Sequence, residues 1–597
     1  MPELQEPEHD EVLGHAFDRR LTARLWDAAR PHHRLVWSSI ALFPFIALVE
    51  LAQPYLLKVA IDDHILKSDW VGLSVVATLY AATLIVLYGL RMAEAYLMAL
   101  TGQGVIHDLR QRLFTHLVRL EAAFFDRTPV GRLMTRVLSD VEAVSEAFTS
   151  GVFAIVADVI TLTGVVAVML WIDWRLALIT FAIVPVLAAV AGYFRLRARD
   201  AYREVRRRLA RLNAFLQESL SGIAVIQLFA REAHERREFD TRNADHRRAM
   251  FGSTVYESSL FAAVEALGSV ALAMLLWYGG GRILDGALSF GVLVAFMQYT
   301  NRFFLPVRDL GAKYTVMQSA MASAERIFGL LDRAPVIVEP PAARSVSATG
   351  AGRAEFDGVW FAYEDERWVL ADCRFTIAPG ERVALVGTTG EGKSTCVRLL
   401  TRTWDVGRGR VLVDGVDVRE WDLRRLRRHV GVIFQDPVLF TGTIEANLAV
   451  DGHGRAALEQ AVETANAATL LRRLPRGLDT PLVERAANLS HGERQLLAIA
   501  RALVYNPAIL VLDEATSSVD LESERMIREA MARLTAGRTT ITIAHRLSTI
   551  QNADRILVLH RGRIHEDGTH AALLRQGGLY ARLHELQFVR AGTASAA

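Results

Sequence analysis

Residues 383–395 read Val-Ala-Leu-Val-Gly-Thr-Thr-Gly-Glu-Gly-Lys-Ser-Thr, and their order decides the fold of the second half of the chain. The apolar run 383–386 predicts a buried strand, the glycines after it a loop, and the residues from Lys393 onward a helix. In such a loop the backbone N–H groups and the N-terminus of the next helix face a phosphate. Lys393 is expected to reach the β- and γ-phosphates and Ser394 to ligate magnesium. We therefore predict ATP binding by Gly387, Thr388, Thr389, Gly390, Glu391, Gly392, Lys393, Ser394 and Thr395.

Two carboxylates, Asp513 and Glu514, follow the apolar run 508–512 farther along the chain. Asp513 is expected to hold the magnesium shell, and Glu514 to act as the catalytic residue that polarises the attacking water. His545 follows the β-rich run 539–544 and would emerge at the same sheet edge, near the γ-phosphate. These runs alternate with helical stretches, which predicts an α/β domain with a largely parallel core sheet. Taken alone, the acids would also fit a solvated strand end, and the histidine a structural role.

The first half of the chain differs, because residues 31–310 contain apolar stretches of the ~20-residue length that crosses a bilayer as a helix. We predict six spans, near residues 35–58, 71–92, 149–171, 176–195, 259–280 and 288–308. Short links join the spans in pairs, whereas long polar connections that look helical separate the pairs. The predicted fold class is a membrane α-helical domain with six transmembrane helices, followed by an α/β P-loop nucleotide-binding domain. A soluble bundle with buried helices is the alternative.

Arginine is concentrated in the two long connections. Residues 91–147 contain Arg91, Arg110, Arg112, Arg119, Arg127, Arg132 and Arg136, and residues 195–248 include the run Arg206, Arg207, Arg208. The opposite short links hold only Lys67, Arg175 and Arg282. Positive charge is retained on the cytoplasmic side, so both long connections, both termini and the nucleotide-binding domain are predicted to lie in the cytoplasm, with the spans in the cytoplasmic membrane.

The bulk properties agree with a chain of two unlike parts. At 597 residues it is too long for one core, and 51% of its residues are hydrophobic. A formal net charge of +2 gives no argument for a nucleic-acid partner. The two cysteines, Cys373 and Cys396, are interpreted as structural thiols, and the polar first 30 residues argue against a cleaved signal peptide. We divide the chain into an N-terminal tail (1–30), the membrane domain (31–330), a linker (331–352), the nucleotide-binding domain (353–590) and a C-terminal tail (591–597).

At these motifs the chain resembles the ATP-binding cassette (ABC) family along its whole length, and the order of spans and cassette is similar to the exporter half-transporters. The resemblance implies further site residues. Tyr363 sits where the family stacks an aromatic ring on adenine, and Gln435 matches the glutamine that senses magnesium and faces the membrane domain. Asp520 falls in the dimer-contact loop, and His545 matches the switch histidine. All of these roles are implied by the resemblance.

The signature of the family is the place where this chain departs from it. Ser490, His491, Gly492 and Glu493 occupy the signature, which acts on the ATP held by the partner's cassette, and the family sequence is Leu-Ser-Gly-Gly-Gln. An imidazole in place of the third residue would crowd the phosphate, and a carboxylate in place of the fifth would repel it. Neutral drift is the alternative. The pattern resembles the heterodimeric multidrug exporters, which implies a second half-transporter with an intact signature and a weakened catalytic glutamate; a homodimer is the other possibility.

The resemblance implies an ATPase that uses ATP and Mg²⁺ to export a hydrophobic or amphipathic cargo by alternating access. The cargo would be a drug-like compound, a lipid or a peptide. An ATP-gated channel or regulatory protein on the same fold is the alternative, whereas the spans argue against a non-transporting cassette ATPase.

Residues 125–133 and 221–232 resemble the two coupling helices that press on the cassettes. Glu50 and Asp158, acids within spans, would either line the cargo path or join helices structurally.

Overall fold

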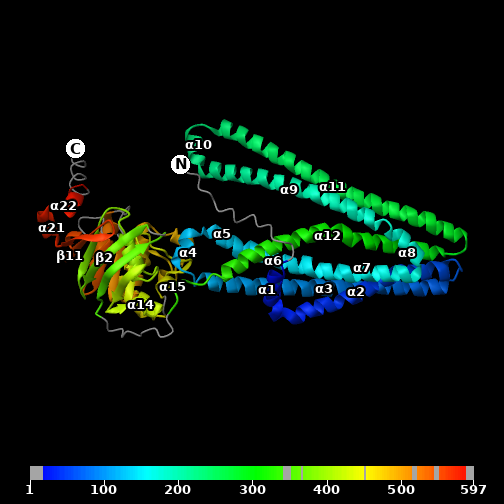
Figure 1. The fold of residues 1–597 in the computed structure, drawn as a ribbon. Coiled ribbons are helices and arrows are strands. Elements are labelled where there is room, and N and C mark those ends of the chain that lie inside the picture. The colour runs from blue at the N-terminus through cyan, green and yellow to red at the C-terminus, as the bar shows by residue number, and fades with distance from the viewer. Residues whose placement is uncertain are drawn as a thin grey trace. The chain divides into compact units, whose positions relative to one another are not determined.

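The computed structural model describes residues 18–339, 351–364, 367–449, 452–513, 521–543 and 550–586. Within these ranges the chain forms two compact units (Figure 1). The first unit contains the chain up to Val118 together with Val130–Arg333, and its described residues are helical. The second unit contains the chain from Ala334 onward together with Arg119–Pro129. A stretch of 11 residues from the first long connection therefore packs with the second unit.

The first unit is built from long helices joined by short turns. Its helices are α1 (Arg19–Ala29), α2 (His33–Val59), α3 (Trp70–Leu117), α5 (Val130–Thr135), α6 (Val141–Glu146), α7 (Ala154–Ile172), α8 (Trp174–Phe181), α9 (Val184–Ser221), α10 (Ile223–Leu228), α11 (Glu232–Leu284) and α12 (Phe290–Leu331). Helix α3 continues well past the predicted second span, and α9 and α11 together form a long antiparallel pair (Figure 1). The long connections are helical extensions of the spans, as the sequence predicted.

Five helical stretches among the described residues are long and apolar enough to cross a membrane. They are Arg19–Ile65, Trp70–Leu117, Val130–Ile172, Trp174–Ser221 and Glu232–Leu284, and they contain the first five predicted spans. The sixth, 288–308, falls on α12 except for its first two residues, and this helix is long enough but carries Gln298, Asn301 and Arg302 in the middle of its apolar stretch. Helix α12 nevertheless packs against α2, α7 and α11, so it belongs to the same bundle.

Polar side chains at the short links start the helices and tie the links together. Asp173 accepts hydrogen bonds from the N–H groups of Arg175 (2.9 Å) and Leu176 (3.1 Å), which caps α8. Its other oxygen lies 2.8 Å from the guanidinium of Arg282 at the end of α11. Asp62 accepts from the Ser289 hydroxyl (2.5 Å) and the Gly291 N–H (2.7 Å) at the start of α12. The three links are therefore joined by capping carboxylates.

The acids within the spans join neighbouring helices. Glu50 on α2 lies 2.7 Å from Arg91 on α3, and Arg91 also binds Glu94 at 2.9 Å. Asp158 on α7 forms an ion pair with Lys313 on α12. A charge at membrane depth is costly unless it is paired. Of the two predicted roles, these contacts therefore favour joining helices over lining the cargo path.

The second unit contains two main sheets. Its elements are α4 (Ala122–Arg127), β1 (Ala354–Ala362), β2 (Trp368–Ile377), β3 (Arg382–Val386), α13 (Lys393–Leu400), β4 (Arg408–Val413), β5 (Val416–Asp417), α14 (Leu423–His429), β6 (Val430–Ile433), β7 (Gly442–Thr443), α15 (Ile444–Leu448), α16 (Arg455–Thr464), α17 (Ala468–Arg473), β8 (Pro481–Leu482), α18 (His491–Tyr505), β9 (Ile509–Asp513), α19 (Leu521–Thr535), β10 (Thr539–Ile543), β11 (Arg555–His560), β12 (Arg563–Gly568), α21 (His570–Gln576) and α22 (Leu579–His584). One sheet has the order β2-β1-β4-β5 and the other β12-β11-β3-β10-β9-β6. Strands β11, β3, β10, β9 and β6 are parallel, so the prediction of a largely parallel core sheet is confirmed.

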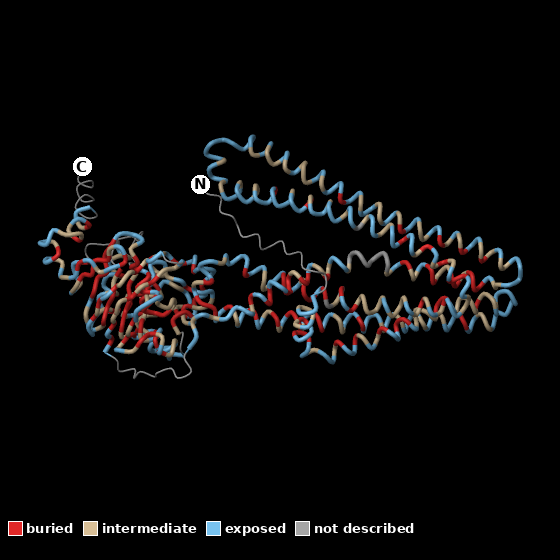
Figure 2. Tube along the Cα trace, viewed as in Figure 1, coloured by how far each residue is buried: buried red, intermediate tan, exposed pale blue. Residues whose placement is uncertain are grey.

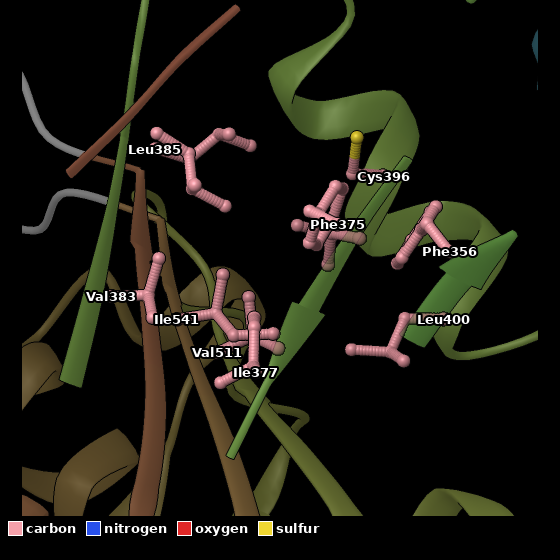
Figure 3. Close-up of a pocket in the computed structure, with 11 residues that line it drawn as sticks. Phe356, Phe375, Ile377, Val383, Leu385, Cys396, Leu400, Val511 and Ile541 are labelled. Carbon is pink, nitrogen blue, oxygen red and sulfur yellow. The ribbon is translucent and has the colours of Figure 1, made fainter. Parts of the chain in front are cut away.

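Helix α13 packs against both sheets in the core of this unit, where Figure 2 shows buried residues gathered on the strands. Phe356 and Phe375 stack with ring centroids 4.4 Å apart. Beside them lies a cavity of about 10 Å³ lined by apolar side chains and Cys396 (Figure 3). A space of this size and lining is too small for a nucleotide and at the limit for one water.

Both cysteines are unbonded and buried in this core, which confirms the interpretation as structural thiols. The hydrogen bond with Cys373, together with burial, raises the pKa of the Cys396 thiol well above its ordinary value. A thiol reacts as its thiolate, so both features slow modification.

We predict that a thiol reagent such as Ellman's reagent at pH 8 leaves both cysteines of the native chain unmodified and modifies both after unfolding in guanidinium chloride. The absorbance of the released thiolate measures the extent. Rapid modification of the native chain at either cysteine would contradict this account of the core.

Candidate nucleotide-binding site

The parallel register brings the predicted site residues to one edge of the six-stranded sheet. Ile543 pairs with Leu385 on one side and with Asp513 on the other, and Leu512 pairs with Ile433. Strands β3, β10, β9 and β6 therefore end side by side. The loop 387–392 follows β3, Asp513 closes β9, and Gln435 follows β6.

The glycines of this loop permit a backbone that other residues would hinder. Gly390 and Gly392 have φ angles of +91° and +102°, in the left-handed region. A Cβ on Gly387 would lie 2.5 Å from the carbonyl oxygen of Leu559 on β11, so the loop leaves the sheet in close contact with the next strand. Gly392 precedes α13, whose N-terminus therefore faces the loop. This is the geometry that a phosphate-binding loop requires.

The Lys393 side chain is held inside the loop. Its ammonium donates to the carbonyl oxygens of Gly387 (2.8 Å) and Thr388 (2.9 Å), and the residue is only 6% exposed. Burial lowers the pKa of Lys393, and the negative charges of Glu391 and Asp513 act in the opposite direction. Since Asp513 is close enough to influence Lys393, the structure brings together the two sequence motifs that the magnesium and phosphate roles require.

Tyr363 lies beside the same helix. Its hydroxyl is 3.0 Å from the Thr395 hydroxyl, and its ring packs edge-on against Trp404 with centroids 4.9 Å apart. The guanidinium of Arg398, on the exposed side of α13, lies over the Tyr363 ring at 5.5 Å. The aromatic residue predicted for adenine stacking is therefore joined to the phosphate loop through Thr395 and Arg398.

The signature residues form the start of α18. The Ser490 hydroxyl accepts from the Glu493 N–H (3.2 Å), and the Glu493 carboxylate accepts from the Ser490 N–H (2.8 Å), which makes a capping box. The His491 Nε2 lies 3.1 Å from the amide nitrogen of Gln495. The carboxylate of Glu493 therefore covers the N-terminus of its own helix.

Three predicted site residues, Glu514, Asp520 and His545, lie outside the described residues. Ser394 is exposed in the first turn of α13, and Gln435 is exposed beyond β6. The described residues contain no cluster of three or more His, Cys, Asp or Glu side chains that would form a metal site by itself. Mg²⁺ commonly takes only one or two protein ligands beside phosphate and water, so the oxygen ligands Ser394, Gln435 and Asp513 are compatible with it.

The sequence did not indicate which side chains hold α4 against this unit. Asp126 on α4 lies 3.2 Å from Arg398, and Arg127 donates to the carbonyl oxygen of Tyr363. Helix α4 ends at Arg127 because Thr128, before Pro129, is extended. The contact helix is thus 122–127, earlier than the segment 125–133 that resembles a coupling helix, and α5 begins the next part of the first unit. The proline was the available signal for this boundary.

Comparison with known proteins agrees with both units. Residues 36–307 match the family described as ABC transporter transmembrane region, and residues 370–517 match the family described as ABC transporter. An ABC transporter ATP-binding protein of Bacillus subtilis (strain 168), YfiC, is 37% identical over 95% of this chain and 94% of its own length. An ATP-dependent lipid A-core flippase of Syntrophus aciditrophicus (strain SB) is 35% identical over 95% of this chain and 94% of its own.

A solved structure of a bacterial Atm1-family ABC exporter with ATP bound is also similar. Its TM-score is 0.77 at 30% sequence identity, covering 93% of this chain and 98% of that chain. The fold and the site define a membrane protein whose helical bundle is joined to a P-loop ATPase unit. The chain belongs to the ABC transporter family, and its two parts are those of an ATP-driven exporter.

We predict that Lys393→Ala removes most of the affinity for ATP, because it deletes the charge that would pair with the phosphates. Equilibrium binding of a fluorescent ATP analogue measures the loss. The control is Arg408→Ala, which changes an exposed residue on β4 that makes a cation–π contact with Trp368. Binding at wild-type affinity by the Lys393 variant would show that this loop does not hold the phosphates.

Proposed function

We propose that this chain is one half of a dimeric exporter that moves a lipid or a drug-like amphipathic molecule across the cytoplasmic membrane. The observation that carries the proposal is the sheet edge at which the loop 387–392, Lys393 and Asp513 meet, in a chain whose described residues contain five helical stretches of spanning character. ATP would bind at this edge, and its hydrolysis would reset the membrane helices after cargo release.

The paired charges in the spans support an uncharged or amphipathic cargo. Asp158 is paired with Lys313, and Glu50 shares Arg91 with Glu94, so each of these acids already has a basic partner within the protein. Two similar proteins point the same way by name: one is the lipid A-core flippase, and another, YgaD of Bacillus subtilis (strain 168), is assigned to multidrug export and is 35% identical over 94% of this chain and 99% of its own.

The nucleotide roles follow from position. Ser394, Gln435 and Asp513 would hold magnesium, which supplies positive charge to the phosphate oxygens when it is bound. Glu514 and His545 directly follow β9 and the run that contains β10, so we assign them the catalytic roles of polarising water and facing the γ-phosphate. Thr388, Thr389 and Gly390 would contribute backbone N–H groups, and Tyr363 the adenine platform.

The orientation follows from charge and from an exposed apolar tip. Arginine is abundant on the long connections, which supports a cytoplasmic location for them, for both termini and for the second unit. At the far end of the α9–α11 pair, Leu228, the last residue of α10, is 81% exposed and the following Phe229 is 73% exposed. Apolar side chains this exposed favour a docking surface, consistent with the resemblance of 221–232 to a coupling helix.

The proposed export is tested in proteoliposomes with fluorescent phospholipid analogues and a panel of amphipathic dyes. ATP-dependent movement of at least one of these, together with ATPase stimulation by the same compound, supports the function. Ionic currents without cargo movement would instead support a channel on this fold.

Coupling between the membrane helices and ATP should depend on α4. We predict that Asp126→Ala combined with Arg127→Ala keeps ATP affinity within about twofold but removes cargo stimulation of hydrolysis, because exposed ion pairs contribute only about 0–1 kcal/mol to the fold. ATPase assays with and without cargo measure both. In the matched control, the charge exchange Asp126→Arg with Arg398→Asp keeps an oppositely charged pair at this position and leaves Arg127 unchanged, so cargo stimulation should be retained. Full stimulation in the first variant would exclude α4 as the link.

The partner is proposed to be a different half-transporter. In a homodimer both sites would face a signature whose helix N-terminus is covered by Glu493, whereas a partner with an intact signature would complete one site with Lys393, Asp513, Glu514 and His545 of this chain. Asp520 would lie in the contact loop. The partner could then lose its own catalytic glutamate with little further effect.

We therefore expect the chain alone to hydrolyse ATP slowly, with no stimulation by cargo, and the complex with its partner to be fast. In the complex, Glu514→Gln should slow hydrolysis by at least ~100-fold, the usual loss on removing acid–base catalysis. The matching change in the partner should have little effect. As a restoration control, His491→Gly with Glu493→Gln should activate the chain alone. Robust, cargo-stimulated hydrolysis by the unaltered chain alone would support a homodimer.

A further inference from the structure

The Glu391 side chain is the one acidic group of the phosphate loop, and it does not extend toward solvent. The side chain is 14% exposed, and its carboxylate makes contacts with the turn between β11 and β12. Oxygen Oε1 lies 3.2 Å from the Nδ1 of His560, and Oε2 accepts a hydrogen bond from the Arg561 N–H. Because an ionised carboxylate only accepts, the His560 contact requires a proton on Nδ1. The loop is thus joined to a turn about 170 residues away in the chain.

A third contact is made within the loop. The Thr388 hydroxyl donates to Glu391 Oε1 at 2.9 Å. The same carboxylate therefore contacts Thr388, near the start of the loop, as well as the β11–β12 turn. Partial burial acts to raise the pKa of Glu391, but the hydrogen bonds from Thr388 and Arg561 and the imidazole of His560 outweigh it and lower that pKa below the ordinary value. The carboxylate is therefore ionised and held by three donors.

The turn that receives these contacts is itself firmly placed. Strand β11 is the parallel neighbour of β3, so its end lies beside the start of the loop. Gly562 at the turn accepts a hydrogen bond from the Ala371 N–H (3.0 Å), and a Cβ on Gly562 would lie 2.6 Å from the carbonyl oxygen of Val369. Behind His560, the ring of His565 on β12 lies 5.9 Å away, edge to face. Because the β11–β12 turn is held by these contacts, a bond to it can hold the phosphate loop in place.

We propose that Glu391 is a positioning residue that fastens the phosphate loop to the β11–β12 turn and thereby sets the affinity for ATP. The proposal rests on nucleotide binding at this loop. Simple electrostatics predicts the opposite sign, because removing a negative charge near a phosphate site should strengthen binding. The two accounts are therefore separated by the direction of the effect.

The test measures equilibrium binding of a fluorescent ATP analogue to the purified full-length chain in its dimer. Glu391→Ala is expected to weaken binding about tenfold, which corresponds to ~1.4 kcal/mol. Glu391→Gln, which keeps the shape but cannot accept at both ends, should lie between it and the wild type. His560→Ala should weaken binding in the same direction. If the contact is direct, the double variant Glu391→Ala/His560→Ala loses no more than Glu391→Ala alone.

Arg561→Gln is the matched control, since the contact uses its backbone N–H and not its side chain, and it should bind as the wild type does. Hydrogen exchange provides a readout that charge alone would not change: backbone amides of 387–395 should exchange faster in Glu391→Ala, with the rest of the second unit unaltered. Equal or tighter ATP binding by both Glu391 variants would overturn the proposal. If Lys393→Ala also bound ATP normally, the assignment of the loop itself would fail instead.

Discussion

The parallel pairing of β3 between β10 and β11 is the constraint on which the nucleotide site depends. Because the strands run in one direction, their carboxyl ends open on the same edge, and residues far apart in the chain meet there. The close approach of Gly387 to the Leu559 carbonyl then directs the loop back over the start of α13. Lys393, Asp513 and the turn at Arg561 take their positions from this arrangement.

In the membrane unit, contacts between charged and polar side chains determine which helices lie next to each other, as the strand register determines which residues meet in the sheet. Three basic residues of α12 bind different segments of the chain: Arg302 binds Gln53 at 2.6 Å, Lys313 binds Asp158, and Arg326 binds Asp140 at 2.6 Å. Polar groups in an apolar medium gain little from lipid, so such contacts specify which helices are neighbours. Arg302, one of the polar residues that interrupt the apolar stretch of α12, is thus also one of the residues that attach this helix to α2.

Single side-chain contacts hold two short segments in place, helix α4 and the first turn of α18. Helix α4 has only six residues and little stability of its own, yet Asp126 and Arg127 attach it to Arg398 and Tyr363, both next to the phosphate loop. At α18, Glu493 accepts the N–H of Ser490 and supplies the negative charge that a helix N-terminus favours. The contacts of α4 join it to a different part of the second unit. The contact of Glu493, in contrast, stays within α18 and accepts an N–H group at the start of that helix.

Much of the fold and of the site follows from local sequence alone. Apolar length determines a spanning helix, because a bilayer of fixed thickness must be crossed, and the strand–glycine–lysine order around 383–395 determines a phosphate loop, because few other residues allow that backbone. Tertiary structure alone decided the partners of Glu391, Arg398 and the acids of the spans. The contacts of Glu391 with the β11–β12 turn, of Arg398 with α4 and of the span acids with neighbouring helices join residues tens to hundreds of positions apart, and such contacts leave no periodic pattern in the sequence. Helix α4 illustrates both kinds of information. Pro129 is a local signal in the sequence that predicts where the helix ends, but only tertiary packing decided that the helix belongs to the second unit.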